Sequence, residues 1–500
     1  MADGAAAPGA GQAATLQWLC RQGWHLLSAP EQEALRGGMQ GLLLAPRLAE
    51  ALQARRFHYK GQRHPLSAHG IAQAVRQVAA TSLAEGLLPA NEQLYNQVAG
   101  GVTVSELMPD GKRHQPTIAL IDWHDPAANR WDVAELPSLP SAQGLHACSP
   151  GLVCFVNGIP LVVIEAAATL EEALARHLRH QRQGGATRLY AYAQLLVALS
   201  GPQARYGTTG TPAAQWLRWC DEEVTDAQAA EPAAQGPGRQ RRRPPATETD
   251  RLLAALLQPE RLLEFLRVFV LFDPKAGKVV ARPEQVIATR AVLACLHACT
   301  PGGLVCQAQG SGLGFTMAFV AKALLLQAQL PACRVVVVAD RPGLEDRLAR
   351  NCRGSGSFGP VVPAQGGPMP ARAGTGRHVA WRIGQGSERL VFTTARRFNR
   401  ALRLAECRNA SADLVVLADE GWWRPDGPAP DPHVQLRRAL PHAACVAFSD
   451  TDDAAASPCG PVTYPGPMPR ALADGEMPPP HDLARWGGLA AQEPAGLYQV

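Results

Sequence analysis

Lysine is the residue type that this sequence most clearly lacks. The 48 basic residues include lysines at positions 60, 112, 275, 278 and 322, and all the others are arginines. No lysine lies between Lys112 and Lys275, so that stretch has no amine for proton transfer, and arginine is a poor substitute because it stays charged. The net charge of +5 over 500 residues permits a nucleic-acid partner but does not by itself indicate one.

Paired metal-ligand motifs are also missing. The 12 cysteines include no Cys-x-x-Cys pair, and no Cys/His cluster completes the nearest two, Cys295 and Cys299. We therefore expect no structural zinc site, and predict buried thiols in a reducing, cytoplasmic compartment. The N-terminus has neither a basic segment nor an apolar segment, and no run is long enough to cross a bilayer, so neither a signal peptide nor a membrane span is expected.

Length and composition predict several domains of mixed α/β type. With 46% hydrophobic residues, the chain can bury sizeable cores. Segments rich in small residues, Pro, Gly and Arg cannot form a core and mark the boundaries. The predicted organisation is a disordered N-terminus (1–14), a first domain (15–221), a Pro/Arg-rich linker (222–249), a second domain (250–456) and a disordered tail (457–500).

The central stretch, residues 151–168 (GLVCFVNGIPLVVIEAAA), predicts a β-hairpin. Two apolar runs, Leu152–Val156 and Leu161–Ile164, are joined by Asn157-Gly158, a pair typical of a tight hairpin turn. The second run ends on Glu165. A hairpin that ends on an acid is the layout of the restriction-endonuclease-like core. There an Asp, a Glu and a Lys two residues after the Glu hold a divalent metal and steady the attacking water.

Two of these three positions lack the reactive group. Gly151 stands at the Asp position and Ala167 at the Lys position. Glu165 is therefore the candidate catalytic and metal-binding residue of the hairpin. A lone glutamate at the end of a strand is more often a solvated terminus than a catalyst, so both interpretations remain open.

The second domain contains a phosphate-loop pattern. A strand (Leu304–Gln307) precedes a Gly-rich turn and an apolar helix (Phe315–Leu326), an order in which backbone N–H groups cradle phosphates. The candidate nucleotide-binding residues of the turn are Gly310, Ser311, Gly312, Leu313 and Gly314. A working loop has Lys where Leu313 stands and Ser or Thr where Gly314 stands. The phosphate-binding ammonium and the Mg²⁺-binding hydroxyl are therefore missing at those two positions.

Further strands alternate with helices and predict a doubly wound parallel sheet. They are the apolar runs 334–339, 389–393, 413–418 and 443–448. Asp419-Glu420 follows the third run, as a Walker B pair does, with the Asp on Mg²⁺ and the Glu polarising water. Acidic residues commonly end strands, so the pair gains its weight from its position after the phosphate loop.

Nine segments in order give the chain a resemblance to the R (motor and nuclease) subunit of type I restriction enzymes. They lie between about Gln17 and Asp453 and include NEQLYNQVAGGVTV, LIDWHDPAANRWDV, FVNGIPLVVIE, GGLVCQAQGSG and LVVLADE. The resemblance implies a nuclease domain followed by a RecA-like ATPase domain of the superfamily 2 helicases. It implies ATP and Mg²⁺ as cofactors, and double-stranded DNA with methyltransferase and specificity subunits as partners.

The same resemblance assigns roles to individual residues. Glu165 matches the nuclease glutamate, Gln285 the residue that contacts adenine, and Asp419 and Glu420 the Walker B pair, with Asp419 a vestigial metal ligand. Asp340-Arg341 and Thr393-Thr394 match segments beside the ATP and DNA paths. The resemblance also implies a second RecA-like domain, which is expected to begin where this chain ends.

The replaced residues all stand at positions that would bind metal or phosphate or take part in catalysis, whereas the apolar strand segments are kept. We therefore predict an R-subunit homologue without catalytic activity that binds at most DNA or a methyltransferase partner. The alternatives are an active subunit whose site is completed by a separate chain, and a fragment without function.

Overall fold

The computed structural model describes residues 10–464 with gaps, and the chain divides into two units that are described separately. Unit 1 is Met1–Leu271 with Gly277–Val280, and unit 2 is Phe272–Ala276 with Ala281–Val500. The gaps are 38–40, 137–138, 141–146, 149, 183–185, 220–245, 274, 299, 301, 309, 328–329, 331, 340–375, 424–431 and 451–461.

The centre of unit 1 is a six-stranded mixed sheet in the order β1-β8-β11-β12-β13-β14. The strands are β1 (His25–Leu26), β8 (Trp131–Glu135), β11 (Leu152–Val156), β12 (Ile159–Ala166), β13 (Leu195–Ser200) and β14 (Gln203–Gly207). β12 runs parallel to β13, and β11 runs antiparallel to both of its neighbours. Every residue of β11 and β12 is buried, as their unbroken apolar runs require.

The predicted hairpin turn is confirmed and has a clear sequence cause. Asn157 and Gly158 have φ of 51° and 78°, the left-handed region that Asn and Gly tolerate best. The Asn157 side chain accepts a hydrogen bond from the Arg130 amide (2.8 Å) and donates to the Leu120 carbonyl (2.9 Å). A Cβ on Gly158 would lie 2.4 Å from the carbonyl oxygen of Leu44, so this position also needs glycine.

Within the described residues, the helices of unit 1 are α1 (Ala10–Arg21), α2 (Ala29–Arg36), α3 (Ala45–Gln53), α4 (Ala68–Ala79), α5 (Leu87–Gly100), α6 (Leu170–His180), α7 (Thr187–Tyr192), α9 (Glu248–Leu256) and α10 (Pro259–Val268). In α6, the Thr169 hydroxyl caps the first turn, and Ala173, His177 and His180 form the buried face. This face packs on β12 and β13, which brings two histidines to the sheet.

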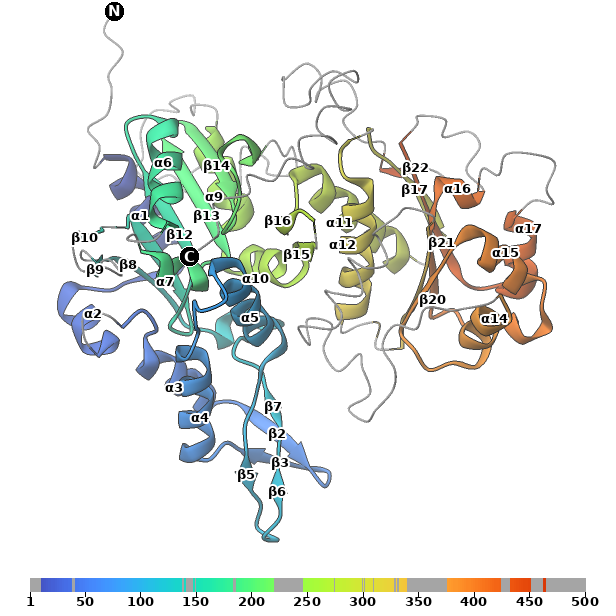
Figure 1. Ribbon diagram of the computed structural model, residues 1–500, viewed down its shortest axis with the longest axis horizontal. Coiled ribbons are helices and arrows are strands. Elements are labelled where there is room, and N and C mark those ends of the chain that lie inside the picture. The colour runs from blue at the N-terminus through green and yellow to red at the C-terminus, as the bar shows by residue number, and fades with distance from the viewer. Residues whose placement is uncertain are drawn as a thin grey trace, which may run out of the picture. The chain divides into compact units, whose positions relative to one another are not determined.

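Short antiparallel strands form a separate part of unit 1 that we call the β arm, residues 56–65 and 102–118. Its strands are β2 (Arg56–Tyr59), β3 (Gln62–Pro65), β4 (Val102–Thr103), β5 (Glu106–Leu107), β6 (Arg113–His114) and β7 (Thr117–Ile118). They pair as β2-β3, β4-β7 and β5-β6. Figure 1 shows these strands extending away from the six-stranded sheet, beyond α3 and α4.

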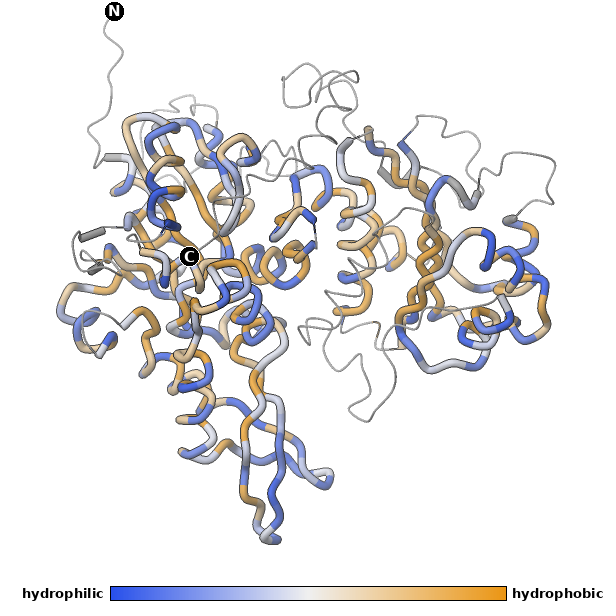
Figure 2. Tube along the Cα trace, in the orientation of Figure 1, coloured by the Kyte–Doolittle hydropathy of each residue, from blue (hydrophilic) through white to orange (hydrophobic). Residues whose placement is uncertain are grey.

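Unit 2 contains a six-stranded parallel sheet, which confirms the predicted doubly wound fold. Its order is β19-β18-β20-β21-β17-β22, with the bounds Leu390–Thr393, Arg334–Val338, Leu414–Asp419, Ala444–Ser449, Gly302–Cys306 and Val462–Tyr464. The strands form an apolar band in Figure 2. Figure 1 shows α11 (Pro283–His297) and α12 (Leu313–Leu326) on one face, and α14 (Gly376–Gln385), α15 (Ala395–Leu402) and α17 (Pro432–Ala439) on the other.

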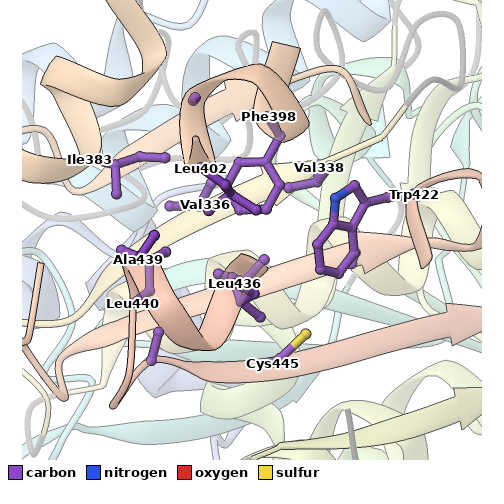
Figure 3. Close-up of a cluster of buried hydrophobic side chains, with 14 of the residues drawn as sticks. Val336, Val338, Ile383, Phe398, Leu402, Trp422, Leu436, Ala439, Leu440 and Cys445 are labelled. Carbon is purple, nitrogen blue, oxygen red and sulfur yellow. The ribbon is translucent and has the colours of Figure 1, made fainter. Parts of the chain in front are cut away.

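A cluster of buried hydrophobic side chains covers the face of this sheet on which α14, α15 and α17 lie (Figure 3). Phe398 of α15 and Trp422 of α16 (Glu420–Trp423) meet edge to face with ring centroids 5.4 Å apart. The Trp422 indole N–H donates to the Asn399 side chain (2.8 Å) and the residue is almost fully buried. Trp422 is therefore a core residue and is not placed to stack on a base.

Several predicted boundaries differ from the structure. Residues 10–14, expected to be disordered, belong to α1, and α9 begins inside the expected linker. Residues 248–271 form two helices and the start of a strand, because Pro259 begins a new helix. The contacts of α9 and α10 place them in unit 1, so residue 250 lies inside that unit. In the expected tail, Val462–Tyr464 pairs with β17.

Two further expectations concern the cysteines and the membrane. Cys154, Cys333 and Cys407 are buried thiols as predicted, whereas Cys445 is disulfide-bonded. Within the described residues, no helix has the length and apolar character needed to cross a bilayer.

Candidate functional site

Glu165 lies inside β12 and is completely buried. It stands beside Ala198 of β13, and α6 covers it. The interpretation of a solvated strand end is therefore wrong, because the strand continues to Ala166 and the following helix folds back over it. Burial of a carboxylate without compensation is costly, so its surroundings decide its role.

Two polar groups approach the Glu165 carboxylate. The Gly151 amide donates to Oε1 at 3.3 Å, and His180 Nδ1 lies 3.2 Å from the same oxygen. The histidine contact lacks hydrogen-bond alignment, and Glu165 Oε2 and His180 Nδ1 are both buried without a hydrogen bond in the described structure. No sequence pattern indicated this pair, because the two residues meet only where α6 packs on β12.

Neighbouring residues pack closely against both degenerate nuclease positions, Gly151 and Ala167. Ala167 is buried, and its amide donates to the Leu199 carbonyl (3.1 Å). A Cβ on Gly151 would lie 2.3 Å from the carbonyl oxygen of Ile164, so an aspartate there requires the two strands to move apart. Arg176 of α6 donates to the Ala166 carbonyl (3.3 Å) and to Glu172 (2.6 Å), so its guanidinium is already engaged.

This arrangement does not fit a nuclease metal centre. A nuclease metal ion needs at least two carboxylates as ligands. Glu165, whose Oε2 is buried without a hydrogen bond in the described structure, supplies one carboxylate. Across the described ranges, no group of three or more His, Cys, Asp or Glu side chains is placed to hold a metal ion. The site can therefore hold a buried polar pair but lacks the donor set for metal-assisted hydrolysis.

Asp132 is a second buried acid in the same sheet, but it lies elsewhere. It is fully buried on β8 and faces His25 Nδ1 (3.2 Å), Arg130 Nε (3.3 Å) and Arg47 Nε (3.6 Å). Asp132 pairs with Phe155, at the far end of β11 from Gly151. Four residues of strand correspond to roughly 13 Å, so Asp132 does not complete the Glu165 site.

In unit 2, the phosphate-loop pattern forms the predicted strand–turn–helix. Gly310 and Gly312 have φ of 87° and 86°, and Gly312 is the N-cap of α12. Leu313 is the first residue of that helix and is buried, so its side chain packs inward where the expected lysine would reach a phosphate. The Ser311 hydroxyl is buried without a hydrogen bond in the described structure.

Gln285 holds this loop. Its side-chain amide donates to the carbonyls of Ser311 (3.0 Å) and Gly312 (3.3 Å), and its Oε1 accepts from the Arg282 amide (3.0 Å). A Cβ on Gly312 would lie 2.8 Å from Gln285 Nε2, which shows how closely the two segments approach. Gln285 is 2% exposed and its amide donates within the loop, while one acceptor lone pair of its Oε1 is left over.

The remaining loop residues complete an internal network. The Thr316 hydroxyl donates to Gln307 Oε1 (2.7 Å), and Gln307 Nε2 donates to the Glu284 carbonyl (3.3 Å). Thr316 is fully buried, so it does not replace the hydroxyl missing at Gly314. These residues do not fit a Mg²⁺-bound nucleoside triphosphate, because Leu313 and Gly314 supply neither the ammonium nor the hydroxyl that would hold it.

Asp419 lies at the same edge of the sheet as the loop. The backbone N–H of Gln307 donates to the Ser449 carbonyl of β21 (3.0 Å). On the other side of β21, Asp419 of β20 pairs with Phe448. One strand therefore separates the loop from the Asp419-Glu420 pair, as a nucleotide site between β17 and β20 requires. Thr394 caps α15 through its hydroxyl, and Asp340-Arg341 lies outside the described residues.

Comparisons with known proteins agree with both units. Residues 10–215 match the family model of the type I restriction enzyme R protein N terminus, and residues 284–453 match that of the SWI2/SNF2 ATPase. Unit 1 thus has the restriction-endonuclease-like fold, and unit 2 the RecA-like fold.

Among similar proteins is the type I restriction enzyme HindI endonuclease subunit of Haemophilus influenzae, 26% identical over 469 residues. The match covers 87% of this chain and 42% of that protein. The putative type I restriction enzyme MjaIXP endonuclease subunit of Methanocaldococcus jannaschii is 27% identical over 383 residues, which cover 71% of this chain and 34% of that protein. The chain thus spans less than half the length of these relatives.

Proposed function

We propose a function from the premise that this chain is an R-subunit-like protein of the type I restriction enzymes. It keeps the framework of both the nuclease and the motor domains, and acts by binding DNA or a methyltransferase partner of a restriction complex without catalysing cleavage or ATP hydrolysis. Location in the cytoplasm, where those partners meet DNA, belongs to the same proposal.

The observation that carries the proposal is a phosphate loop without its cation. Leu313 is buried at the first turn of α12, while Gln285 uses its amide to hold the loop carbonyls. A positioned cation that faces a transferring phosphate is worth several kcal/mol in the transition state, which corresponds to a loss of about a thousandfold in rate or more. Leu313 cannot supply that stabilisation.

The nuclease half supports the same conclusion by an independent route. Glu165 is a buried acid beside His180, and the positions that would add an acid and a lysine are Gly151 and Ala167. A Cβ at position 151 collides with the Ile164 carbonyl, so the present strand pairing is adapted to glycine. Substituting one residue therefore does not rebuild the site.

Turnover assays test the proposal. Purified chain with Mg²⁺, ATP and plasmid DNA is expected to release phosphate and nick DNA at the rates of protein-free controls. The matched variants are Glu420→Gln for phosphate release and Glu165→Gln for nicking, and each is expected to equal the parent chain. Phosphate release that Glu420→Gln abolishes would contradict the proposal. If it appears only after a second chain with a RecA-like domain is added, the active, completed subunit is the correct interpretation.

A further inference from the structure

The β arm carries an unusual share of the positive charge of the chain. Residues 56–65 and 102–118 contain five lysines and arginines and two acids, and they include two of the five lysines. Both acids are engaged within unit 1. Asp110 Oδ2 accepts from Tyr59 Oη and Lys60 Nζ, both at 2.8 Å, and buried Glu106 accepts from the Ser67 amide (3.1 Å). The arm therefore presents a surplus of cations to solvent.

The packing inside the arm directs these cations outward. Phe57 and Tyr59 of β2 lie on the face that contacts His114, with ring centroids 5.7 and 5.0 Å apart. Side chains alternate along a strand, so Arg56 points away from this internal layer, and so does Arg63, which pairs with His58 on the same face as Arg56. Arg113 precedes His114 and is exposed for the same reason. The aromatic and histidine side chains join the two hairpins into one layer.

The cations that result are available for an external partner. Arg56, Arg63, Lys112 and Arg113 are all exposed, and within the described part of the chain none of them forms an ion pair. Arg56 donates to the carbonyls of Gln53 and Arg55, which orients its guanidinium without neutralising it. Figure 2 shows hydrophilic residues along β3 and β6, the strands that contain Arg63 and Arg113.

We propose that the β arm binds the phosphate backbone of double-stranded DNA through Arg56, Arg63, Lys112 and Arg113. The proposal rests on the proposed function, in which the chain binds DNA, and assigns a surface to that binding. A two-stranded β-ribbon with outward arginines follows a duplex, and guanidinium groups pair well with phosphate oxygens. Phe57 is buried and the Tyr59 hydroxyl is tied to Asp110, so the arm offers no aromatic platform for single-stranded bases.

An acidic protein partner is less compatible with the same surface. Protein interfaces are centred on buried apolar anchors, and the exposed apolar side chain of the arm is Leu107, 73% exposed. A single exposed leucine is ordinary on a protein surface. A series of arginines and lysines along a ribbon is the pattern expected for a polyanion.

Fluorescence anisotropy with a labelled duplex tests the arm. The test variant of the full chain replaces Arg56, Arg63, Lys112 and Arg113 by Gln, and the matched control replaces Arg188, Arg403, Arg408 and Arg438, four exposed arginines elsewhere. The arm variant is expected to bind at least about tenfold more weakly near 0.1 M salt, because four phosphate contacts are lost. The magnitude of the slope of log K against log salt should decrease by about three to four, since each lost phosphate contact contributes about 0.9 to it. The control should bind like the parent chain.

Several outcomes would overturn the inference. Equal affinities of the arm variant and the control would exclude the arm as the DNA surface, and so would a parent chain that binds no duplex. If the arm variant binds duplex normally but no longer captures a methyltransferase subunit, the arm is a protein interface. None of these results bears on catalysis, which the turnover assays decide separately. Equal melting temperatures of the variants show that the substitutions leave the fold intact.

Discussion

Replacing Asn91 by alanine is expected to lower the free energy of unfolding of unit 1 by about 3 kcal/mol. Asn91 is completely buried in α5, and its amide donates to the carbonyls of Tyr190 (3.0 Å), Ala191 (3.0 Å) and Ala193 (2.7 Å). One side chain thereby fixes α5 to the turn between α7 and β13. Alanine leaves these buried carbonyls with fewer partners.

The same residue also serves a buried lysine. Asn91 Oδ1 accepts from Lys278 Nζ at 2.7 Å, and Gln194 Oε1 lies 2.5 Å from that ammonium. Burial holds the pKa of Lys278 well below its usual range, because removing the ammonium from water disfavours its charge. Losing one of the acceptors increases this cost, which is why the expected effect exceeds that of an ordinary hydrogen bond.

Denaturant unfolding, followed by hydrogen exchange in peptides of unit 1, measures the effect. The matched control is Gln93→Ala, an exposed position on the same helix, which should change the free energy by less than about 0.5 kcal/mol. Asn91→Asp is informative because it keeps the acceptor for Lys278 but turns a carboxylate oxygen toward three carbonyls. We expect it to be destabilising too. An Asn91→Ala variant as stable as Gln93→Ala would show that the network does not hold unit 1 together.

Lowering the pH is expected to reduce the stability of unit 1, which is the second large effect. His177 is fully buried in α6, with Nδ1 2.9 Å from the Tyr190 hydroxyl and Nε2 2.9 Å from the Val197 carbonyl. Facing a carbonyl, Nε2 carries the proton of the neutral ring. Burial lowers the pKa of His177 from 6.5 to about 4, although Glu165 favours the charged form, and nearby His180 opposes that charge.

The sign of the pH dependence follows from this direction. Above pH 6.5 the ring is neutral in both states, so unit 1 has its full stability. As the pH falls from about 6.5 toward about 4, the unfolded chain takes up a proton that the folded chain does not. The free energy of unfolding therefore decreases over this interval, by about 3 kcal/mol in all.

Denaturant titrations between pH 4 and 7.5 measure the slope. The variant His177→Gln is less stable at neutral pH, but its free energy of unfolding should depend less on pH across this range. His69→Gln, at an exposed position of α4, should retain the slope of the parent chain. If His177→Gln and His69→Gln give the same slope, another group accounts for acid sensitivity.

The sequence predicted the strands well where their residues are apolar without interruption. Residues 152–156 form β11 as expected, and the four strands predicted after the phosphate loop all occur, with bounds shifted by a residue or two. Burial on both faces leaves few alternatives for such runs. The strands of the β arm are only two to four residues long and show no periodicity that distinguishes them from loops.

The sequence predicted which residues form the candidate sites, but not what surrounds those residues. Sequence placed Glu165 on the second hairpin strand, whereas its burial and its contact with His180 depend on how α6 folds back across β12 and β13. Gln285 was predicted as a ligand-reading residue, a role that remains a prediction. Its bonds to Ser311 and Gly312 join residues 26 and 27 positions apart, which no local pattern encodes.

Both units show the same relation between framework and chemistry. In unit 1 the sheet surrounding Glu165 is fully packed, while Gly151 and Ala167 leave the acid without the companions needed for hydrolysis. In unit 2 the loop and Asp419 lie at one edge of the sheet, while Leu313 is buried where the expected lysine would stand and Gln285 binds the loop carbonyls. These features support the proposed role in binding without catalysis, for which the β arm is the proposed surface.

Isothermal titration calorimetry of ATP into the purified chain, with and without Mg²⁺, tests the loss of the nucleotide site most directly. We predict no binding heat at millimolar nucleotide in either condition, because the side chains of Leu313 and Gly314 supply no group for phosphate or metal. Binding in the micromolar range that requires Mg²⁺ and is lost in Asp419→Asn would contradict the account, and would make the active-subunit interpretation the leading one.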